Sequence, residues 1–191
     1  AASLALSPER IILCEPTCNR VVSGQKGMIK LEMTAEGRAA HSAFPDEGVS
    51  AVHRLLDALE AIRRADWPTD PTLGETTCNV GELEGGVAAN VLAPSARADL
   101  LFRTVSPSEP LIEKIEALAG GDVTIDPVAY NDPVRFDPPD DCQTCVVPFN
   151  TDASYLSELG PIWLVGPGDI RVAHSDDEHI TQGSIDRGIR L

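Results

Sequence analysis

The chain has 191 residues, of which 42% are apolar and only 4% aromatic, and it carries a formal net charge of −15. This length fits one domain of ordinary size or two small ones, and the composition predicts a mainly aliphatic core. The acidity excludes nucleic acid and anionic membrane surfaces as partners, because both attract basic proteins, and solubility is its simplest explanation.

Two further exclusions concern targeting. Ala1 to Pro8 lack the basic stretch followed by an apolar stretch that marks a signal peptide. No run of about 18 apolar residues occurs, so no membrane span is expected. The five cysteines form no dense framework, and their odd number favours a reducing cytoplasm.

The first expected element is a short buried strand from Ile11 to Leu13. It ends at Cys14-Glu15-Pro16-Thr17, which brings a carboxylate into a loop. The next four-residue signal, Gly24-Gln25-Lys26-Gly27, predicts a turn. From Met28 to Ala35 apolar and polar residues alternate, which predicts a half-buried strand.

A loop follows from His41 to Asp46, and a helix comes after it. Apolar residues recur at three- and four-residue steps from Val49 to Ile62, with Ser50 as the expected cap. Trp67-Pro68 should end this helix, because proline cannot continue the hydrogen-bond ladder. His53 lies beside the apolar stripe and is interpreted as a packing or surface residue.

Two strands are then expected, from Thr76 to Leu83 and from Ala96 to Val105. A helix from Ser106 to Leu118 stops at Gly120, and a last strand runs from Val123 to Tyr130. The order strand, helix, strand, strand, helix, strand is the split βαβ, ferredoxin-like pattern. It predicts one antiparallel sheet with two helices on one face.

This ferredoxin-like domain is placed at residues 24–134, and a linker rich in Pro and Asp follows from Asn131 to Asp141. Val146 to Pro148 and Ile162 to Val165 then predict buried parallel strands, with a short helix from Ser154 to Leu159 between them. Residues 1–23 and 135–191 are thus two parts of a second α/β domain, neither large enough to bury its own sheet.

Two loops carry groups that suit a metal ion. Glu15 follows a buried strand, where a carboxylate is well placed for a metal or substrate, although a plain turn carboxylate is the alternative. His174 precedes a run of acidic residues that ends at His179. Histidine beside carboxylates suits a hard or borderline cation, and a solvated acidic loop with an incidental histidine is the alternative.

Three residues of the ferredoxin-like domain carry potentially chemical side chains. His41 lies in a loop, and the alternative interpretation is an ordinary surface histidine. Asn90 follows Gly85-Gly86, and the alternative interpretation is a residue that simply adopts the left-handed conformation of a turn. Arg103 lies on a strand, and its planar fork suits a carboxylate, with an exposed strand arginine as the alternative.

Close cysteine pairs raise a separate possibility. Cys14 and Cys18, together with Cys142 and Cys145, have a spacing that allows a structural four-sulfur zinc site. The alternative is four unlinked thiols.

Five motifs in this order carry a family resemblance. They are Cys14 to Thr17, Ala40 to Pro45, Gly85 to Pro94, Phe149 to Ala153 and Val165 to Glu178. Together they resemble the zinc-dependent amidohydrolases that include acetylornithine deacetylase, succinyl-diaminopimelate desuccinylase, glutamate carboxypeptidase and aminoacylase.

The resemblance implies roles for the residues in these motifs. Glu15 and His174 would each bind one zinc, and His174 is preferred to His179, which is expected on the following helix. His41 would reach across a dimer to stabilise the oxyanion of the partner's reaction. The remaining matches are implied substrate contacts: Asn90, Arg103, Lys26, Thr151 and Asp152.

For the whole protein, the resemblance implies a ferredoxin-like lid and dimerisation domain inserted in an α/β zinc-hydrolase catalytic domain. It implies a cytoplasmic homodimer with two zinc ions per subunit, or cobalt or manganese. The substrate would be an N-acyl amino acid or peptide, and Phe149 to Leu159 favour an acetylornithine deacetylase-like choice. The amide bond would be cleaved.

The family pattern is incomplete in this sequence. Its zinc-ligating H-x-D-x-x-P motif, bridging Asp and catalytic Glu pair have no counterparts among the 191 residues. We therefore expect the missing region to precede Ala1, and we expect this chain alone to bind zinc poorly and to hydrolyse nothing. The alternative is a non-catalytic dimerisation module of the same fold.

Overall fold

A computed structural model describes residues 8–191, which divide into two compact units. The first unit comprises residues 8–26, 71–73 and 133–191. The second comprises Gly27–Asp70 and Gly74–Asp132. The prediction that Ala1 to Pro8 form no signal peptide falls on residues 1–7, which lie outside the described part.

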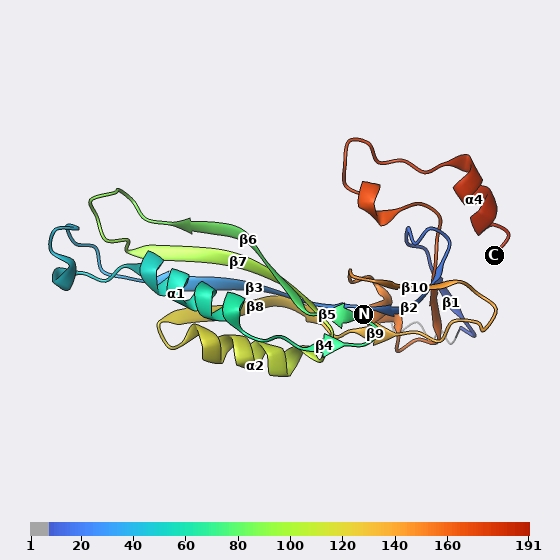
Figure 1. Ribbon diagram of the computed structural model, residues 1–191, viewed down its shortest axis with the longest axis horizontal. Helices are drawn as coiled ribbons and strands as arrows, with labels where there is room; N and C mark the ends of the chain where they lie inside the picture. The colour runs from blue at the N-terminus through green and yellow to red at the C-terminus, as the bar shows by residue number, and fades with distance from the viewer. Residues whose placement is uncertain (1–7) are drawn as a thin grey trace, which may run out of the picture. The chain divides into compact units, whose positions relative to one another are not determined.

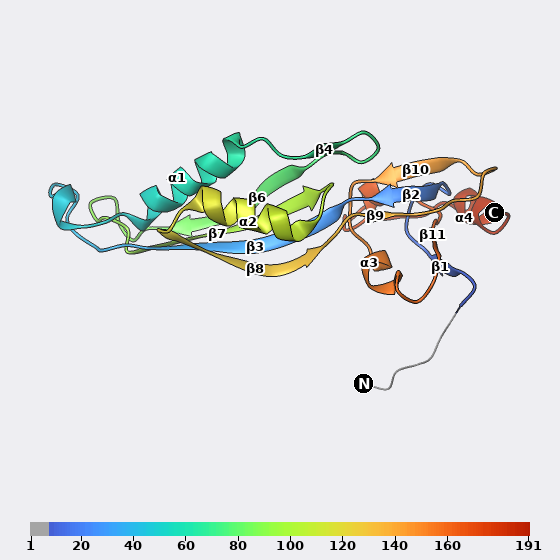
Figure 2. The ribbon, with the colours of Figure 1, turned by 90° about the horizontal axis from the view of Figure 1, so that it is seen from below.

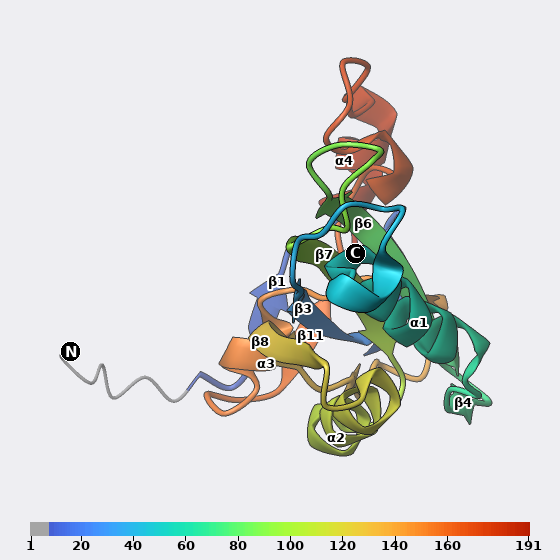
Figure 3. The same ribbon diagram turned by 90° about the vertical axis from the view of Figure 1, so that its left-hand side faces the viewer.

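The second unit is built on a four-stranded antiparallel sheet in the order β6-β7-β3-β8 (Figure 1). Helices α1 and α2 lie on the same face of this sheet (Figure 3). The predicted split βαβ order is therefore confirmed. The element bounds are β3 Gly27–Glu36, α1 Ala51–Arg64, β6 Thr77–Gly85, β7 Ser95–Thr104, α2 Ser108–Ala119 and β8 Val123–Asn131.

Strand alternation makes this sheet two-faced. On β7, Ala98, Leu100 and Phe102 are buried against the helices, whereas the intervening Arg97 and Arg103 lie on the opposite face. The core is almost wholly aliphatic, as the composition predicts. Its most buried members from the other elements are Ile29, Leu31, Met33, Leu55, Ile62 and Ile115.

Capping residues and glycine set the ends of α1 and α2. The Ser50 hydroxyl accepts from the His53 N–H at 3.3 Å, so the predicted cap of α1 is confirmed. The helix ends at Arg64, ahead of Trp67, whose ring meets Phe102 edge-on at 5.1 Å. Gly120 ends α2 with a φ of 72°.

The first unit holds short strands in two small sheets. β1 (Ile11–Leu13) lies where a strand was predicted and pairs in parallel with β11 (Ile162–Leu164). The expected burial of β1 is wrong, because Ile12 is 63% exposed. β2 (Val21–Gln25) pairs in parallel with β10 (Thr144–Val147) and antiparallel with β9 (Val134–Arg135) (Figure 2). Val22, Val147 and Leu164 form its small core. Its helical segments are α3 (Ala153–Leu156), η2 (Ile170–Val172) and α4 (Gln182–Gly188).

The second unit also contains three shorter elements. η1 (Pro45–Glu47) interrupts the loop predicted from His41 to Asp46. β4 (Thr69–Asp70) and β5 (Gly74–Glu75) pair as a small antiparallel hairpin. Among residues 8–191, no helix is both long and apolar enough to cross a membrane.

Three local predictions are wrong. The residues from Gly24 to Gly27 form no turn, because β2 and β3 follow one another almost without interruption. Gly24 instead allows close packing, since a Cβ there would lie 2.9 Å from Leu73 Cδ2. The predicted linker contains β9, and His179 lies before α4 rather than on it.

Candidate functional site

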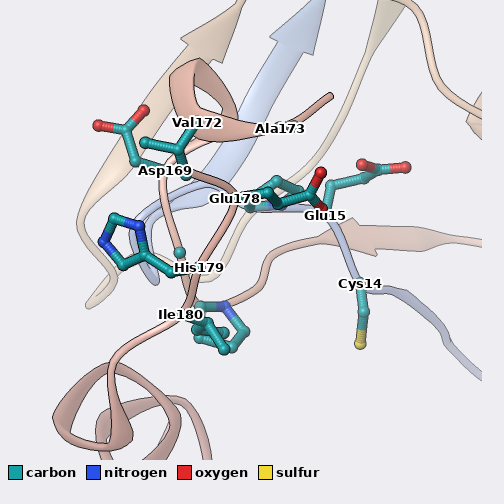
Figure 4. Close-up of a pocket in the computed structure, with 11 residues that line it drawn as sticks. Cys14, Glu15, Asp169, Val172, Ala173, Glu178, His179 and Ile180 are labelled. Carbon is teal, nitrogen blue, oxygen red and sulfur yellow. The ribbon is translucent and has the colours of Figure 1, made fainter. Parts of the chain in front are cut away.

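A cavity of about 420 Å³ lies in the first unit (Figure 4). Its walls come from the segment after β1 and the segment after β11. Because these strands are parallel and paired to their last residues, Leu13 and Leu164, both segments leave the same end of the sheet. The lining residues are Cys14, Glu15, Pro16, Pro167, Gly168, Asp169, Val172, Ala173, Glu178, His179 and Ile180.

Backbone contacts fix the Glu15 segment against the wall. The Thr17 N–H donates to the Gly166 carbonyl at 3.1 Å, and the Gly166 N–H donates to the Thr17 hydroxyl at 3.1 Å. A Cβ at Gly166 would lie 2.5 Å from the Glu15 carbonyl oxygen, a separation too short for two non-bonded atoms. Glycine is therefore required where the two segments meet.

Glu15 carries an uncompensated negative charge at this cavity. Burial raises the pKa of its carboxyl above the ordinary value, and the negative charge of Asp152 raises it further. No basic side chain among residues 8–191 forms an ion pair with Glu15. A cation at this wall would relieve both effects.

The two histidines of the acidic segment differ in position. His174 is exposed, has a left-handed φ of 61°, and donates its backbone N–H to Glu178 Oε2 at 2.8 Å. His179 lines the cavity, with its Nδ1 2.7 Å from the Asp177 carbonyl oxygen. The assignment of His174 as the ligand stays a prediction, and the structure puts His179 in the wall.

Asp169 and Ile180 also line the cavity, and neither is among the site residues expected from the sequence. Asp169 forms a two-atom contact with Arg171, at 3.0 Å from Nε to Oδ1 and 2.5 Å from Nη2 to Oδ2. Hydrogen bonds from the Arg171 side chain and backbone lower the pKa of Asp169 to about 2. The only sequence signal was the Gly166-Pro167-Gly168 turn before it.

The donor set fits a complete zinc site poorly. Within residues 8–191, no group of three or more His, Cys, Asp or Glu side chains is arranged to hold a metal. Zinc sites in proteins take three or four protein ligands. The possible four-cysteine site is therefore not assembled in the described part of the chain, and the five cysteines are free thiols, as the alternative had it.

The second unit brings His41 and Asn90 into neighbouring loops. The Ser42 N–H donates to the Asn90 carbonyl at 2.9 Å, and His41 and Val91 form a β-bridge. His41 Nδ1 accepts from the Ala43 N–H at 3.1 Å. The neutral ring therefore carries its proton on Nε2, which leaves His41 able to donate outward.

Arg103 differs from its neighbour on the same face of β7. Arg97 is paired with Glu32 and Asp99, at 2.5 and 2.9 Å. Arg103 is half-buried, its pKa is lowered by burial, and no carboxylate within residues 8–191 pairs with it. A half-buried guanidinium without an acid suits a carboxylate ligand.

Lys26 and Thr151 are both buried in the first unit. The Lys26 N–H donates to the Val147 carbonyl at 3.2 Å. The Thr151 hydroxyl donates to Gln25 Oε1 at 2.6 Å and accepts from the Ala153 N–H at 3.2 Å. Thr151 thus supports the start of α3, and its contact with substrate stays a prediction.

Comparison with known proteins bears on this arrangement. Residues 23–120 match the family described as peptidase dimerisation domain, in its M20 class. The chain belongs to this family. It is 36% identical to a peptidase M20 domain-containing protein of Schizosaccharomyces pombe, over 95% of this chain and 46% of that protein. It is 37% identical to a probable carboxypeptidase of Aspergillus flavus, over 94% of this chain and 48% of that protein.

Solved structures show the same fold as this M20 chain. A tripeptidase from Staphylococcus aureus aligns with a TM-score of 0.75 and 19% identity, over 98% of this chain and 56% of that one. An aminopeptidase from Bacillus cereus aligns with a TM-score of 0.71 and 18% identity, over 94% and 54%. The chain spans about half the length of the relatives it matches.

Proposed function

We propose that this M20 chain is part of a metal-dependent hydrolase that cleaves the amide bond of N-acyl amino acids or peptides. The observation that supports this most strongly is the position of Glu15 in the wall of the cavity, at the end where the parallel strands β1 and β11 both terminate. Its carboxylate is partly desolvated and has no basic partner among the described residues. The names of the matched relatives, peptidases and carboxypeptidases, support the reaction class.

In the complete enzyme, Glu15 and His174 would each supply one ligand to a pair of zinc ions, with cobalt or manganese as substitutes. The other ligands and the general base would come from residues outside this sequence. The enzyme would be a cytoplasmic homodimer. An acetylornithine deacetylase-like substrate remains our choice, on the residues from Phe149 to Leu159.

The second unit would supply the substrate contacts. His41 Nε2 would donate to the oxyanion in the partner subunit, which is the role its fixed tautomer favours. Arg103 would hold the substrate carboxylate, and Asn90 would contact the substrate from the loop beside His41.

A second candidate is a dimerisation module without catalysis. The observation that favours it is the lack of three assembled metal-binding side chains within the described residues. An H-x-D-x-x-P motif encoded upstream of Ala1 would favour the enzyme over the module.

The test compares the 191-residue chain with the product of the complete gene. Elemental analysis after dialysis should find far less than one zinc in the chain, and assays with N-acetylornithine and dipeptides should find no turnover. The complete protein should hold two zinc ions and hydrolyse an N-acyl amino acid or peptide.

Glu15→Gln in the complete protein should remove one zinc and lower kcat/KM by more than about 100-fold, the upper end of what losing a supporting partner costs. Glu9→Gln, an exposed carboxylate in the same segment, serves as the matched control. Two tight zinc ions or any turnover in the 191-residue chain would overturn the proposed division of ligands. An inactive, metal-free complete protein would favour the module.

A further inference from the structure

Two cysteines of the first unit lie beside the same residue, Arg20. Cys18 occupies the tip of a tight turn that the Arg20 N–H closes on the Thr17 carbonyl at 3.2 Å. The φ values of Cys18 and Asn19, 56° and 61°, are both left-handed, as in a type I′ turn. Cys145 lies on β10 with its Sγ 4.0 Å from the Arg20 carbonyl oxygen.

The parallel pairing of β2 and β10 brings these segments together. Val21, the residue after the turn, is in register with Thr144, and Val22 is in register with Cys145. The two thiols also influence one another electrostatically. Burial raises the pKa of Cys145, nearby Arg20 opposes the rise, and the charge of Cys18 adds to it. The approach of the two segments itself rests on the strand register and on the contact of Cys145 Sγ with the Arg20 carbonyl oxygen, two residues after Cys18.

The two thiols differ in access. Cys18 is exposed and lines a hollow of about 210 Å³ with His179, Thr181 and Arg187. Cys145 is half-buried. A small-molecule disulfide therefore reaches Cys18 first. The remaining cysteines lack this arrangement: Cys14 lines the 420 Å³ cavity, and Cys78 belongs to the second unit.

We propose that Cys18 and Cys145 form a reversible disulfide by exchange with a small-molecule disulfide such as oxidised glutathione. The Cys18 thiolate attacks one sulfur of the disulfide, which breaks the S–S bond and releases one thiol. The Cys145 thiolate then attacks Cys18 Sγ and releases the second thiol. Two protein thiols are oxidised, and one disulfide is reduced to two thiols.

The new bond would tie the turn from Thr17 to Arg20 to β10. Because this turn directly follows Glu15, oxidation would fix the segment that carries the cavity's carboxylate. The modification is independent of the proposed hydrolase activity, and its detection needs no substrate.

The test treats the whole 191-residue chain with oxidised glutathione, counts free thiols, and maps disulfides by peptide mass spectrometry. We expect two thiols to be lost per chain, a Cys18–Cys145 linked peptide, no retained glutathione, and full reversal by dithiothreitol. Cys14→Ser and Cys142→Ser should behave as the unaltered chain does.

Cys145→Ser should trap glutathione on Cys18, because the second step has lost its nucleophile, whereas Cys18→Ser should leave Cys145 reduced. The unaltered chain decides the matter even if a variant fails to fold. Stable glutathione on that chain, a linkage that uses Cys14 or Cys142 instead, or no loss of thiols would each overturn the proposal.

Discussion

Single residues decide the local geometry of the cavity. Glu15 is positioned by two hydrogen bonds between Thr17 and Gly166, one between backbone groups and one from the Gly166 N–H to the Thr17 hydroxyl. The missing Cβ of Gly166 lets the two segments approach. Glu15 could be identified from its place after an apolar strand. The need for glycine at 166 could not be predicted, because it arises from a residue about 150 positions away in sequence, whose position only folding fixes.

Gly166→Ala should destabilise the first unit by about 1–3 kcal/mol, the usual cost of forcing extra volume into a packed site. The added Cβ would meet the Glu15 carbonyl oxygen at 2.5 Å. Urea unfolding, followed by the fluorescence of Trp163 in the first unit, measures the change in unfolding free energy. Gly183→Ala is the matched control, since its Cβ would meet nothing closer than 3.7 Å and alanine favours the α4 helix. Equal losses in both variants would contradict the steric argument.

Asp169 should titrate near pH 2 in the folded chain, because Arg171 stabilises its charged form. A carboxyl with a folded pKa below the ordinary 3.8 contributes stability above that pH, and loses it as the pH falls through about 2. Carboxyl-carbon NMR measures this pKa. Arg171→Met should return it towards 3.8, and Arg190→Met, which removes an exposed arginine elsewhere, should leave it unchanged. An unshifted Asp169 in the unaltered chain would refute the pair.

At the scale of elements, the alternation of apolar and polar residues predicted the strands of the second unit well. The predicted strand from Ala96 to Val105 is β7, with the expected apolar face turned to the helices. The turn predicted from Gly24 to Gly27 is wrong, because glycine can serve close packing as readily as a turn, and Gly24 lies against Leu73. Strand β9 was missed because it is two residues long and has no alternation to detect.

Phe102→Ala should cost about 3–5 kcal/mol of unfolding free energy, since it empties a fully buried site against Trp67. Leu101→Ala, one residue away on the opposite face, should cost much less because its side chain is only half-buried. Chemical denaturation followed by circular dichroism measures both. Similar losses would mean that β7 is not two-faced.

At the scale of the whole molecule, association is the property that the family predicts. Among the described residues, β6 and β8 are the outer strands of the sheet, and edge strands are the ones open to pairing with another chain. Exposed apolar side chains accompany β6 and the loop after it, with Leu83 at 54% and Val87 at 69% exposure. Helix α1 also reaches β6, where Val52 packs against Gly85. Val128 and Tyr130 on β8 are also exposed, so exposure alone does not separate the two edges. We expect β6 to meet a second copy, and variants on both edges test this.

Leu83→Lys should therefore raise the dimer dissociation constant at least about 10-fold, because a charge at a buried contact costs more than about 1.4 kcal/mol. Sedimentation equilibrium over a range of concentrations measures it. Val128→Lys on β8 is the matched control, since Val128 has a similar exposure of 57%. A stronger effect at Val128, or a chain that stays monomeric at every concentration, would argue against the β6 edge.

The sequence by itself determined the order of elements in the second unit, the acidic surface, and the identity of Glu15, His41, Asn90 and Arg103 as candidates. These depend on periodicity, composition and local motifs, which a linear chain displays directly. Only the tertiary structure decided which groups come together: His179 in the wall of the cavity, Gly166 against Thr17, and Cys145 against the Arg20 carbonyl. The reason is physical, because these pairs are joined by strand pairing between distant segments, and no local pattern encodes their distance.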